Sequence, residues 1–325
     1  MNGGLDRATG LAFLGVVIVG GLNGVGVRFS NAELDHLWGA ALRFGLASAL
    51  LFAVVAIRRL PLPRGQALVG SVLYGLIGFA LAYGFAYYGL IETPAGIAMV
   101  ILALVPLLTL LLAVAHGLEK LRAQSLGGSL LALAGVALIF WERLETTAAP
   151  LLSLLAIVAA AFAIAETGVV VKRFPRAHPV SNNALAMAVG ALALLAAALL
   201  FGQSIALPVG ADTLGALAYL VVIGSVVLFM LFLFIIERWT ASATSYSLLL
   251  MPLPAAVGGA LLLGEPITIG LIVGGAVIVL GVYLGAFAPS LARPLPGLLR
   301  RPAPAGPPID EMEARPADLI YPGCP

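Results

Sequence analysis

Two stretches of 30 residues in this sequence share the same pattern: residues 106–135, PLLTLLLAVAHGLEKLRAQSLGGSLLALAG, and residues 252–281, PLPAAVGGALLLGEPITIGLIVGGAVIVLG. Each begins with Pro-Leu, has a Glu 13 residues later, and ends with two glycines that are seven residues apart. An offset of 146 residues aligns the two stretches and also pairs Gly78 with Gly224. Several matches in one register indicate that the chain arose by internal duplication.

The composition around these stretches is that of a membrane protein. Apolar residues make up 62% of the 325 residues, or about 200, while charged residues make up only 10%. Mean hydropathy is +1.11. A soluble globular domain carries roughly 25% charged residues, so that class is excluded, and disordered and disulfide-rich classes are excluded with it. The net charge of +2 is too small to indicate a nucleic-acid partner.

Continuous apolar runs predict ten membrane-spanning helices, because a segment inside a bilayer must satisfy its backbone polar groups internally. The runs do not alternate between apolar and polar residues, which argues against a β-barrel. We expect an all-α integral membrane protein with the lipid bilayer as its surroundings. The predicted spans are residues 11–27, 37–57, 67–90, 94–115, 125–141, 151–171, 183–201, 214–236, 241–263 and 267–288.

Each half of the duplication holds five spans, and this odd number sets the direction of the second copy. The second copy must enter the membrane upside down, which is the inverted arrangement of many transporters. We therefore predict a first repeat over residues 1–145 and an inverted second repeat over 146–288. Residues 289–325 contain 10 prolines and are predicted to form a flexible cytoplasmic tail.

Basic residues predict the orientation, because Lys and Arg favour cytoplasmic loops. With the N-terminus inside, 14 of the 17 basic residues lie on the cytoplasmic side. Arg28 and Arg143 lie on the other side, and Arg43 lies within a span. Both termini are thus predicted to be cytoplasmic.

The motifs resemble those of the EamA family in the drug/metabolite transporter superfamily, over nearly the whole chain to about Phe287. Ala40-Ala41-Leu42-Arg43-Phe44 is similar to a family signature in the second span, and Pro-Leu followed by Glu occurs in both halves. Gly21-Leu22-Asn23 stands where the family usually has Gly-Ser-Asn, and Gly20 stands in place of its preceding Trp. The resemblance implies ten helices in two repeats, a bacterial inner-membrane location and export of amino acids or related metabolites.

Only two ionisable residues lie clearly inside predicted spans, where charges are costly and usually face a cavity or a partner. Arg43 is one, and the opposed directions of the first two spans bring Asn23 to the same depth. Arg43 either lines the substrate path with Asn23 or serves as a structural residue that binds backbone carbonyls.

Glu166 is the second in-span charge, and it follows a run of small residues. Burial of a carboxyl group makes proton uptake near neutral pH plausible, so we expect either proton coupling or contact with a substrate ammonium. The structural alternative is a local interaction with Arg173, which lies seven residues further along the helix.

Several uncharged residues complete the predicted path. Tyr83 and Tyr87 lie one turn apart on the third span, and Ser245 and Tyr246 belong to a polar start of the ninth span. For the hydroxyls, bonding to carbonyls of their own helix is the alternative. Pro106 and Pro252 are predicted to break the fourth and ninth spans, either lining a cavity or forming packing kinks.

The sequence thus predicts a secondary transporter that moves a small metabolite by alternating access and is not an enzyme. It has no phosphate-cradling loop and no group of histidines at one depth, so neither a cofactor nor a metal is expected. A membrane sensor or assembly subunit with the same fold is the alternative. Whether the chain pairs with a second copy as a homodimer is left open.

Overall fold

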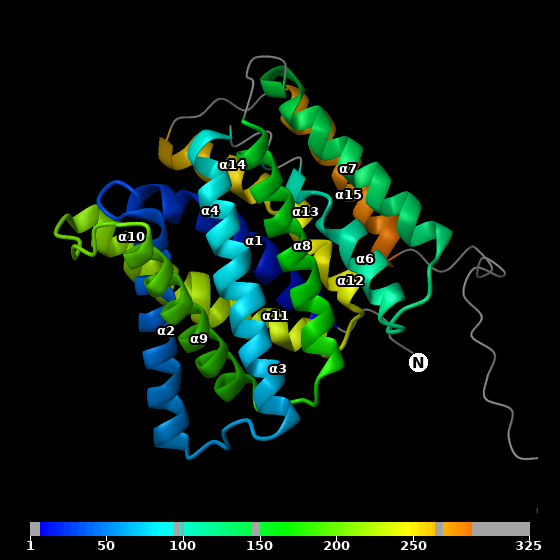
Figure 1. Ribbon diagram of the computed structural model, residues 1–325. Coiled ribbons are helices and arrows are strands. Elements are labelled where there is room, and N and C mark those ends of the chain that lie inside the picture. The colour runs from blue at the N-terminus through cyan, green and yellow to red at the C-terminus, as the bar shows by residue number, and fades with distance from the viewer. Residues whose placement is uncertain (1–6, 94–97, 99–100, 145–149, 264–268, 288–325) are drawn as a thin grey trace, which may run out of the picture. The chain divides into compact units, whose positions relative to one another are not determined.

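A computed structural model describes residues 7–93, 98, 101–144, 150–263 and 269–287, and Figure 1 shows their arrangement. These residues form helices and no strand. Glu265, the glutamate of the second repeated stretch, and the predicted tail lie outside the described residues. The elements are α1 (Arg7–Ser30), α2 (His36–Arg58), α3 (Gln66–Tyr74), η1 (Gly75–Leu81), α4 (Ala82–Glu92), α6 (Val105–Ala115), α7 (Ala123–Leu144), α8 (Leu151–Arg173), α9 (Pro179–Leu200), α10 (Ala211–Val221), η2 (Val222–Val227), α11 (Leu228–Ile236), α12 (Ala241–Ser245), α13 (Ser247–Leu250), α14 (Pro252–Leu263), α15 (Ile269–Val282) and η3 (Tyr283–Phe287).

Seven helical stretches in the described part are long and apolar enough to cross a membrane. Two of them, Gln66–Gly89 and Ala211–Ile236, each join α-helices through a π-helical segment, η1 or η2. The other three predicted spans correspond to α6 for the fourth, to the continuous helix α7 for the fifth, and to α12, α13 and α14 in succession for the ninth. The all-helical membrane fold is confirmed, and the ten predicted spans agree approximately with these elements.

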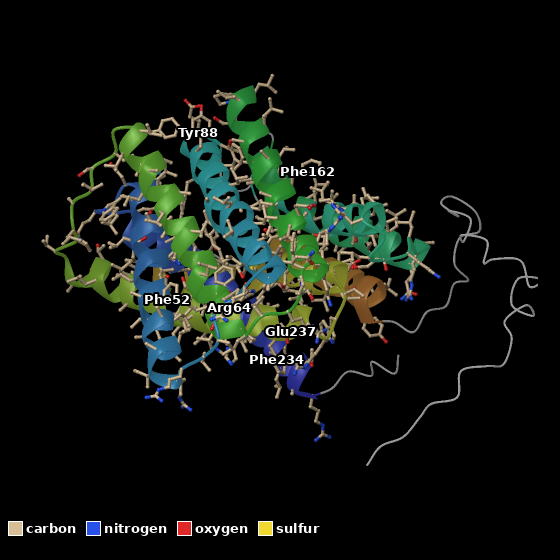
Figure 2. The ribbon with its side chains drawn as sticks, turned by 60° about the horizontal axis from the view of Figure 1, so that its bottom comes forward. Phe52, Arg64, Tyr88, Phe162, Phe234 and Glu237 are labelled. Atoms are coloured by element: carbon tan, nitrogen blue, oxygen red, sulfur yellow. The ribbon has the colours of Figure 1, made fainter. Side chains whose placement is uncertain are left out.

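The exterior of the helices is strongly apolar. Phe162 is 48% exposed and Leu200 is 86% exposed, and Figure 2 shows Phe162 on the outside of α8. A soluble protein rarely leaves so many large apolar side chains in water. A bilayer covers such a surface at no cost, since lipid tails are as apolar as leucine. The chain is therefore a multi-pass membrane protein.

Equivalent helices of the two repeats run antiparallel, as an inverted duplication requires. Along α7 and α15, Gly128 lies against Gly281, and Gly135 lies against Gly274. A Cβ on Gly135 would stand 2.8 Å from the Gly274 carbonyl oxygen, closer than a real Cβ approaches. The 146-residue offset converts one glycine pair into the other, so a local two-fold relates the two helices. Figure 1 shows α7 and α15 side by side.

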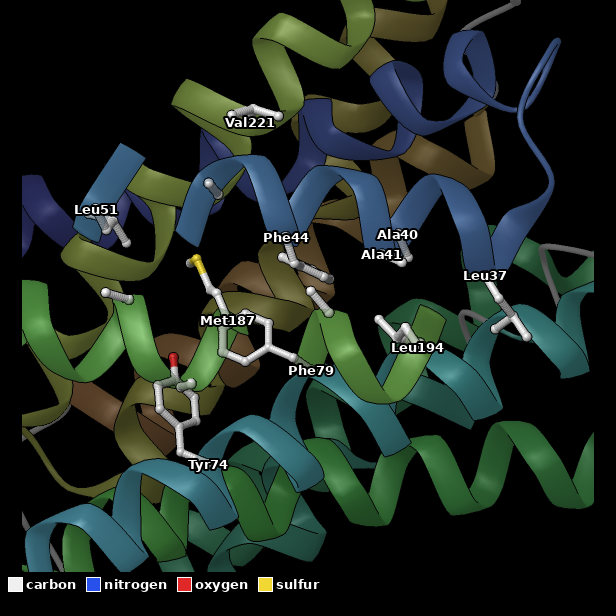
Figure 3. Packing of buried hydrophobic residues seen from close by; sticks show 14 of the residues in the cluster. Leu37, Ala40, Ala41, Phe44, Leu51, Tyr74, Phe79, Met187, Leu194 and Val221 are labelled. Atoms are coloured by element: carbon white, nitrogen blue, oxygen red, sulfur yellow. The ribbon is translucent and has the colours of Figure 1, made fainter. Parts of the chain in front are cut away.

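The same symmetry governs α2 and α9, which pack along each other and carry much of the core. The Ser48 hydroxyl donates to the Ala184 carbonyl at 2.7 Å, while at the opposite end the Leu37 amide donates to Gln203 Oε1 at 3.0 Å. Figure 3 shows Phe44, Phe79 and Met187 packed between these helices and the third span. All three are fully buried.

The remaining contacts follow the two-fold as well. α3, η1 and α4 pack on α8, and α10, η2 and α11 pack on α1. The two π segments occupy matching positions, because residues 76–81 of η1 correspond to residues 222–227 of η2 at the same offset. A π turn shifts the backbone hydrogen bonds by one residue and often marks a functional site.

Candidate functional site

The π segment η2 holds a buried polar cluster formed by Asn23, Arg43, Gly224 and Ser225, which we call the Arg43 cluster. Arg43 Nη2 donates to the Gly224 carbonyl at 2.6 Å, and Arg43 Nε donates to Ser225 Oγ at 2.7 Å. Asn23 Nδ2 donates to the same Gly224 carbonyl at 3.0 Å. Ser225 Oγ in turn donates to the Leu220 carbonyl five residues back, at 2.8 Å. The structure thus brings Asn23 of α1 and Arg43 of α2 together on η2.

The Arg43 side chain carries a buried charge, being only 2% exposed. Among the described residues, no carboxylate lies within 4.0 Å of its guanidinium. Arginine has five N–H donors, and the hydrogen bonds given above use two of them. Asn23 Oδ1 is also buried and has no hydrogen-bond partner. The cluster therefore offers donors for an oxyanion and one acceptor for an amine or hydroxyl.

Two aromatic rings lie near the Arg43 guanidinium, that of Phe44 in α2 and that of Tyr83 in the third span. Arg43 Cζ lies 5.1 Å from the centre of the Phe44 ring and 6.0 Å from that of Tyr83, distances that allow cation–π attraction. Tyr83 and Tyr87 share a face as predicted from their spacing, with ring centres 6.1 Å apart. Phe79 and Phe229 complete the group, their ring centres being 4.7 Å apart.

Glu166 has a partner that the sequence did not suggest. Its Oε1 lies 3.6 Å from Nε2 of His116 at the end of α6, and both side chains are a little over one-quarter exposed. His116 Nδ1 lies 2.9 Å from the Leu112 carbonyl oxygen. A carbonyl can only accept, so Nδ1 carries a hydrogen and Nε2 is the nitrogen that faces the carboxylate.

The predicted residues of the ninth span bond elsewhere. The Ser245 hydroxyl donates to the Ser242 carbonyl of its own helix at 2.7 Å. The Tyr246 hydroxyl lies 2.8 Å from both the Ser125 carbonyl and Ser129 Oγ of α7, so it bonds the ninth span to the fifth. Among the described contacts, neither hydroxyl meets the Arg43 cluster.

Helical continuity is interrupted at both predicted prolines. Turn residues at 103 and 104 precede α6, and Pro106 lies in the first turn of that helix. Met251 separates α13 from α14, which begins at Pro252. Proline suits a first helical turn because the amide it lacks has no partner there.

Two carboxylates tie the ends of the helices together. Glu119 accepts hydrogen bonds from the amide and the hydroxyl of Ser242 at the start of α12. At the other end of the bundle, Glu33 accepts from the Val209 amide at 2.8 Å and from the Thr213 hydroxyl at 2.7 Å. These hydrogen bonds, chiefly that from Thr213, lower the pKa of Glu33 because they stabilise its charged form.

Sequence reasoning missed Ser225, the Gly224 carbonyl and His116. The pairing of Gly78 with Gly224 was visible in the repeat, but nothing in the residue types alone indicates a π turn. His116 lies 50 residues before Glu166, a separation at which contact depends on tertiary packing.

Two inverted helical repeats around a buried polar cluster define the class of membrane transporters built from repeated halves. The model of the family described as "EamA-like transporter family" matches residues 8–141 and again residues 151–286, so the chain belongs to this family.

Individual relatives agree with that assignment. An "Uncharacterized transporter" of Archaeoglobus fulgidus is 25% identical over 271 residues, which cover 81% of this chain and 93% of the relative. A "Probable amino-acid metabolite efflux pump" of Escherichia coli is 24% identical over 299 residues, covering 87% and 96%. A solved structure titled "Crystal structure of protein" matches with a TM-score of 0.73 and 21% identity over 86% of this chain and 96% of that one, which supports the fold.

Proposed function

We propose that this transporter exports a small metabolite, an amino acid or a related compound, by alternating access across the bacterial inner membrane. The observation that carries the proposal is the buried Arg43 guanidinium, which has no carboxylate within 4.0 Å in the described part of the chain. A charge inside a span is costly and usually marks a substrate or ion pathway, and the donors that Arg43 does not use on η2 are free to bind an anion in part of the working cycle. The name of the Escherichia coli relative, an amino-acid metabolite efflux pump, supports the same substrate class.

In this mechanism the repeats rock about the two-fold and open the Arg43 cluster to one side and then to the other. The substrate carboxylate would bind the guanidinium as a charge-assisted pair, and Asn23 Oδ1 would accept from the substrate amine. Tyr83 and Tyr87 would line the path beside it. The distribution of basic residues supports cytoplasmic termini, so export would run from the side of the α2–α3 loop to the side of Glu33.

The pair formed by His116 and Glu166 supports proton coupling. When both side chains are deprotonated, Nε2 and the carboxylate are two acceptors facing each other, and one proton between them removes that repulsion. A proton taken up here during each cycle would link flux to the pH gradient. Ser245 and Tyr246 would act through the packing of the ninth span. A homodimer remains a prediction. The exposed apolar face of α15 could pack against a second copy, and lipid would cover it equally well.

Transport is tested by counterflow. Purified protein is first screened for thermal stabilisation by a metabolite library, and liposomes are then preloaded with each hit. We expect a labelled trace of the same compound to accumulate transiently inside. Absence of accumulation for every hit, with the protein still folded, would contradict transport and favour the sensor or assembly alternative.

Coupling is tested separately with an imposed pH gradient. Glu166→Gln and His116→Gln should each retain counterflow and lose gradient-driven accumulation, because each removes one side of the proton site. Glu92→Gln is the matched control. Glu92 is an exposed carboxylate at the end of α4, where it accepts a hydrogen bond from the Ser153 hydroxyl of α8. Gradient-driven flux that survives in Glu166→Gln would overturn the coupling.

A further inference from the structure

A second polar pocket lies away from the Arg43 cluster, at the end of the bundle that the basic residues predict to be cytoplasmic. It opens between the start of α3, the end of α8 with the segment after it, the start of α9 and the end of α11. Figure 2 brings this end forward and labels Glu237 on its rim. The cavity holds about 230 Å³, which is below the roughly 300–1,000 Å³ of drug-sized sites and suits a small metabolite. Its polar lining consists of Ser71, Tyr74, Lys172, Arg176, Asn182 and Glu237.

The two cations of this pocket form no ion pair with a described carboxylate. Lys172 is half-buried, and no carboxylate among the described residues lies within 4.0 Å of its ammonium. The charges that act on it are Arg176, Glu119 and Glu237. Arg176 is exposed, and its Nη2 donates to the main-chain carbonyl of Glu237 at 3.1 Å. Two cations beside one cavity favour an oxyanion.

Neutral and negative groups complete the lining. Asn182 Oδ1 lies 2.6 Å from Ser71 Oγ, whose single hydrogen also has the Ala67 carbonyl oxygen at 2.9 Å, and the Asn182 N–H₂ is a further donor. The Glu237 carboxylate is partly buried and makes no hydrogen bond or ion pair among the described contacts. The pocket thus presents donors for an anion and, separately, a carboxylate for a cation.

We propose that this pocket binds a small zwitterion, with its oxyanion at Lys172 and Asn182 and its primary ammonium at Glu237. A free amino-acid-like metabolite and the headgroup of phosphatidylethanolamine share this chemistry. Spans three, six and eight, which form the pocket together with the start of span seven, also flank the proposed substrate path. If the occupant is the transported solute, the pocket is where it loads; that part rests on the proposed function, while the binding itself does not.

Binding is measured by calorimetry on the full chain in nanodiscs of phosphatidylcholine alone, with each free proteinogenic amino acid in turn as the titrated ligand. Each amino acid that binds is compared with its deaminated and its decarboxylated analogue; for leucine these are 4-methylpentanoate and 3-methylbutylamine. The variants are Lys172→Met and Glu237→Gln. The matched control is Arg173→Met, since Arg173 is an exposed cation next to Lys172 that does not line the pocket.

We expect both analogues to bind at least about tenfold more weakly than the amino acid, because each loses one charged contact. Lys172→Met should weaken amino-acid binding by a similar factor, and Arg173→Met should leave it unchanged. In Glu237→Gln the amino acid and its deaminated analogue should bind equally. If added phosphatidylethanolamine competes in the native protein and not in Lys172→Met, the headgroup is the occupant.

Three results would overturn the site: no binding by any amino acid together with no lipid competition, equal effects of Lys172→Met and Arg173→Met, or binding that Arg43→Val abolishes while Lys172→Met leaves it intact. Counterflow on the same preparations separates the two proposals. Binding without flux in native protein contradicts transport alone, and flux with unaltered binding in Lys172→Met contradicts this pocket alone.

Discussion

The two π segments have the same backbone and different surroundings. In η2 the residues at positions 224 and 225 are Gly and Ser, and Arg43 of α2 donates to both. In η1 the matching residues are Gly78 and Phe79, and the residue that matches Arg43 in α9 is Val189. There Phe79 is fully buried against Phe44, with ring centres 4.9 Å apart, and Val189 lies against Gly75.

The difference distinguishes features that both repeats share from features that only one repeat has. The π turn is common to both repeats, so it belongs to the fold and allows both spans to bend. Among the described residues of these two regions the charge is present only around η2, and the proposed function assigns it to substrate binding. Glu166 and His116 show the same asymmetry, because their counterparts in the other repeat are Gly20 and Leu262. An inverted repeat can thus keep a symmetric motion around an asymmetric site.

Arg43→Val removes the main difference between the two π segments, because it gives α2 the residue that α9 has at the matching position, Val189. We expect flux to fall at least about 100-fold, since two charge-assisted contacts to the substrate are lost. The protein should still fold, because replacing a buried charge by an apolar side chain is often tolerated. Counterflow measures the first effect and thermal unfolding the second. Near-normal flux in a folded variant would assign Arg43 a purely structural role.

Gly224→Ala and Gly78→Ala compare the two π turns directly. A Cβ on Gly224 would meet the Asn23 side chain, and a Cβ on Gly78 would lie 2.9 Å from Thr167 Cγ2. Both should destabilise by about 1–3 kcal/mol through overpacking. Only Gly224→Ala should also weaken substrate binding, about tenfold, because it displaces Asn23 from the cluster. Equal binding by the two variants would mean that the η2 surroundings have no special role.

The sequence predicted the helices and their repeat better than it predicted the polar contacts between side chains. Apolar run lengths and the 146-residue offset can be read directly from the sequence, and they were sufficient for the approximate spans and for the equivalence of Gly128 and Gly274 in the two repeats. The shared depth of Asn23 and Arg43 followed from helix direction. The acceptor that joins them is the backbone carbonyl of Gly224, which lies at a π turn and accepts hydrogen bonds from both side chains. Residue types do not report that geometry, and they gave no reason to pair His116 with Glu166.

Gly135→Ala tests the part of the molecule where the two repeats remain alike. A Cβ there would lie 2.8 Å from the backbone of α15 at Gly274, so the helices must separate. We expect a loss of about 1–3 kcal/mol in unfolding free energy. Gly281→Ala should cost a similar amount, because the two-fold exchanges Gly135 with Gly281 and a Cβ on Gly281 would lie 2.8 Å from the Gly128 carbonyl oxygen. Gly127→Ala is the control, as a Cβ there meets nothing within 4 Å. Denaturation in mixed micelles measures all three, and a clear difference between Gly135→Ala and Gly281→Ala would argue against the local symmetry.

Glu33 gives the smallest expected effect, because its charge is exposed where that of Arg43 is buried. Its counterpart in the other repeat is Pro179, so this carboxylate also belongs to one half only. The folded-state pKa of Glu33 is lowered, mainly by the hydrogen bond from Thr213. A lowered pKa contributes stability that is fully present above the unfolded-state pKa and is lost as the pH falls through the folded value. Native protein should therefore lose slightly more thermal stability than Glu33→Gln when the pH is taken from neutral to about 4. Parallel pH profiles would show that these hydrogen bonds add nothing measurable, as is common for solvated charges.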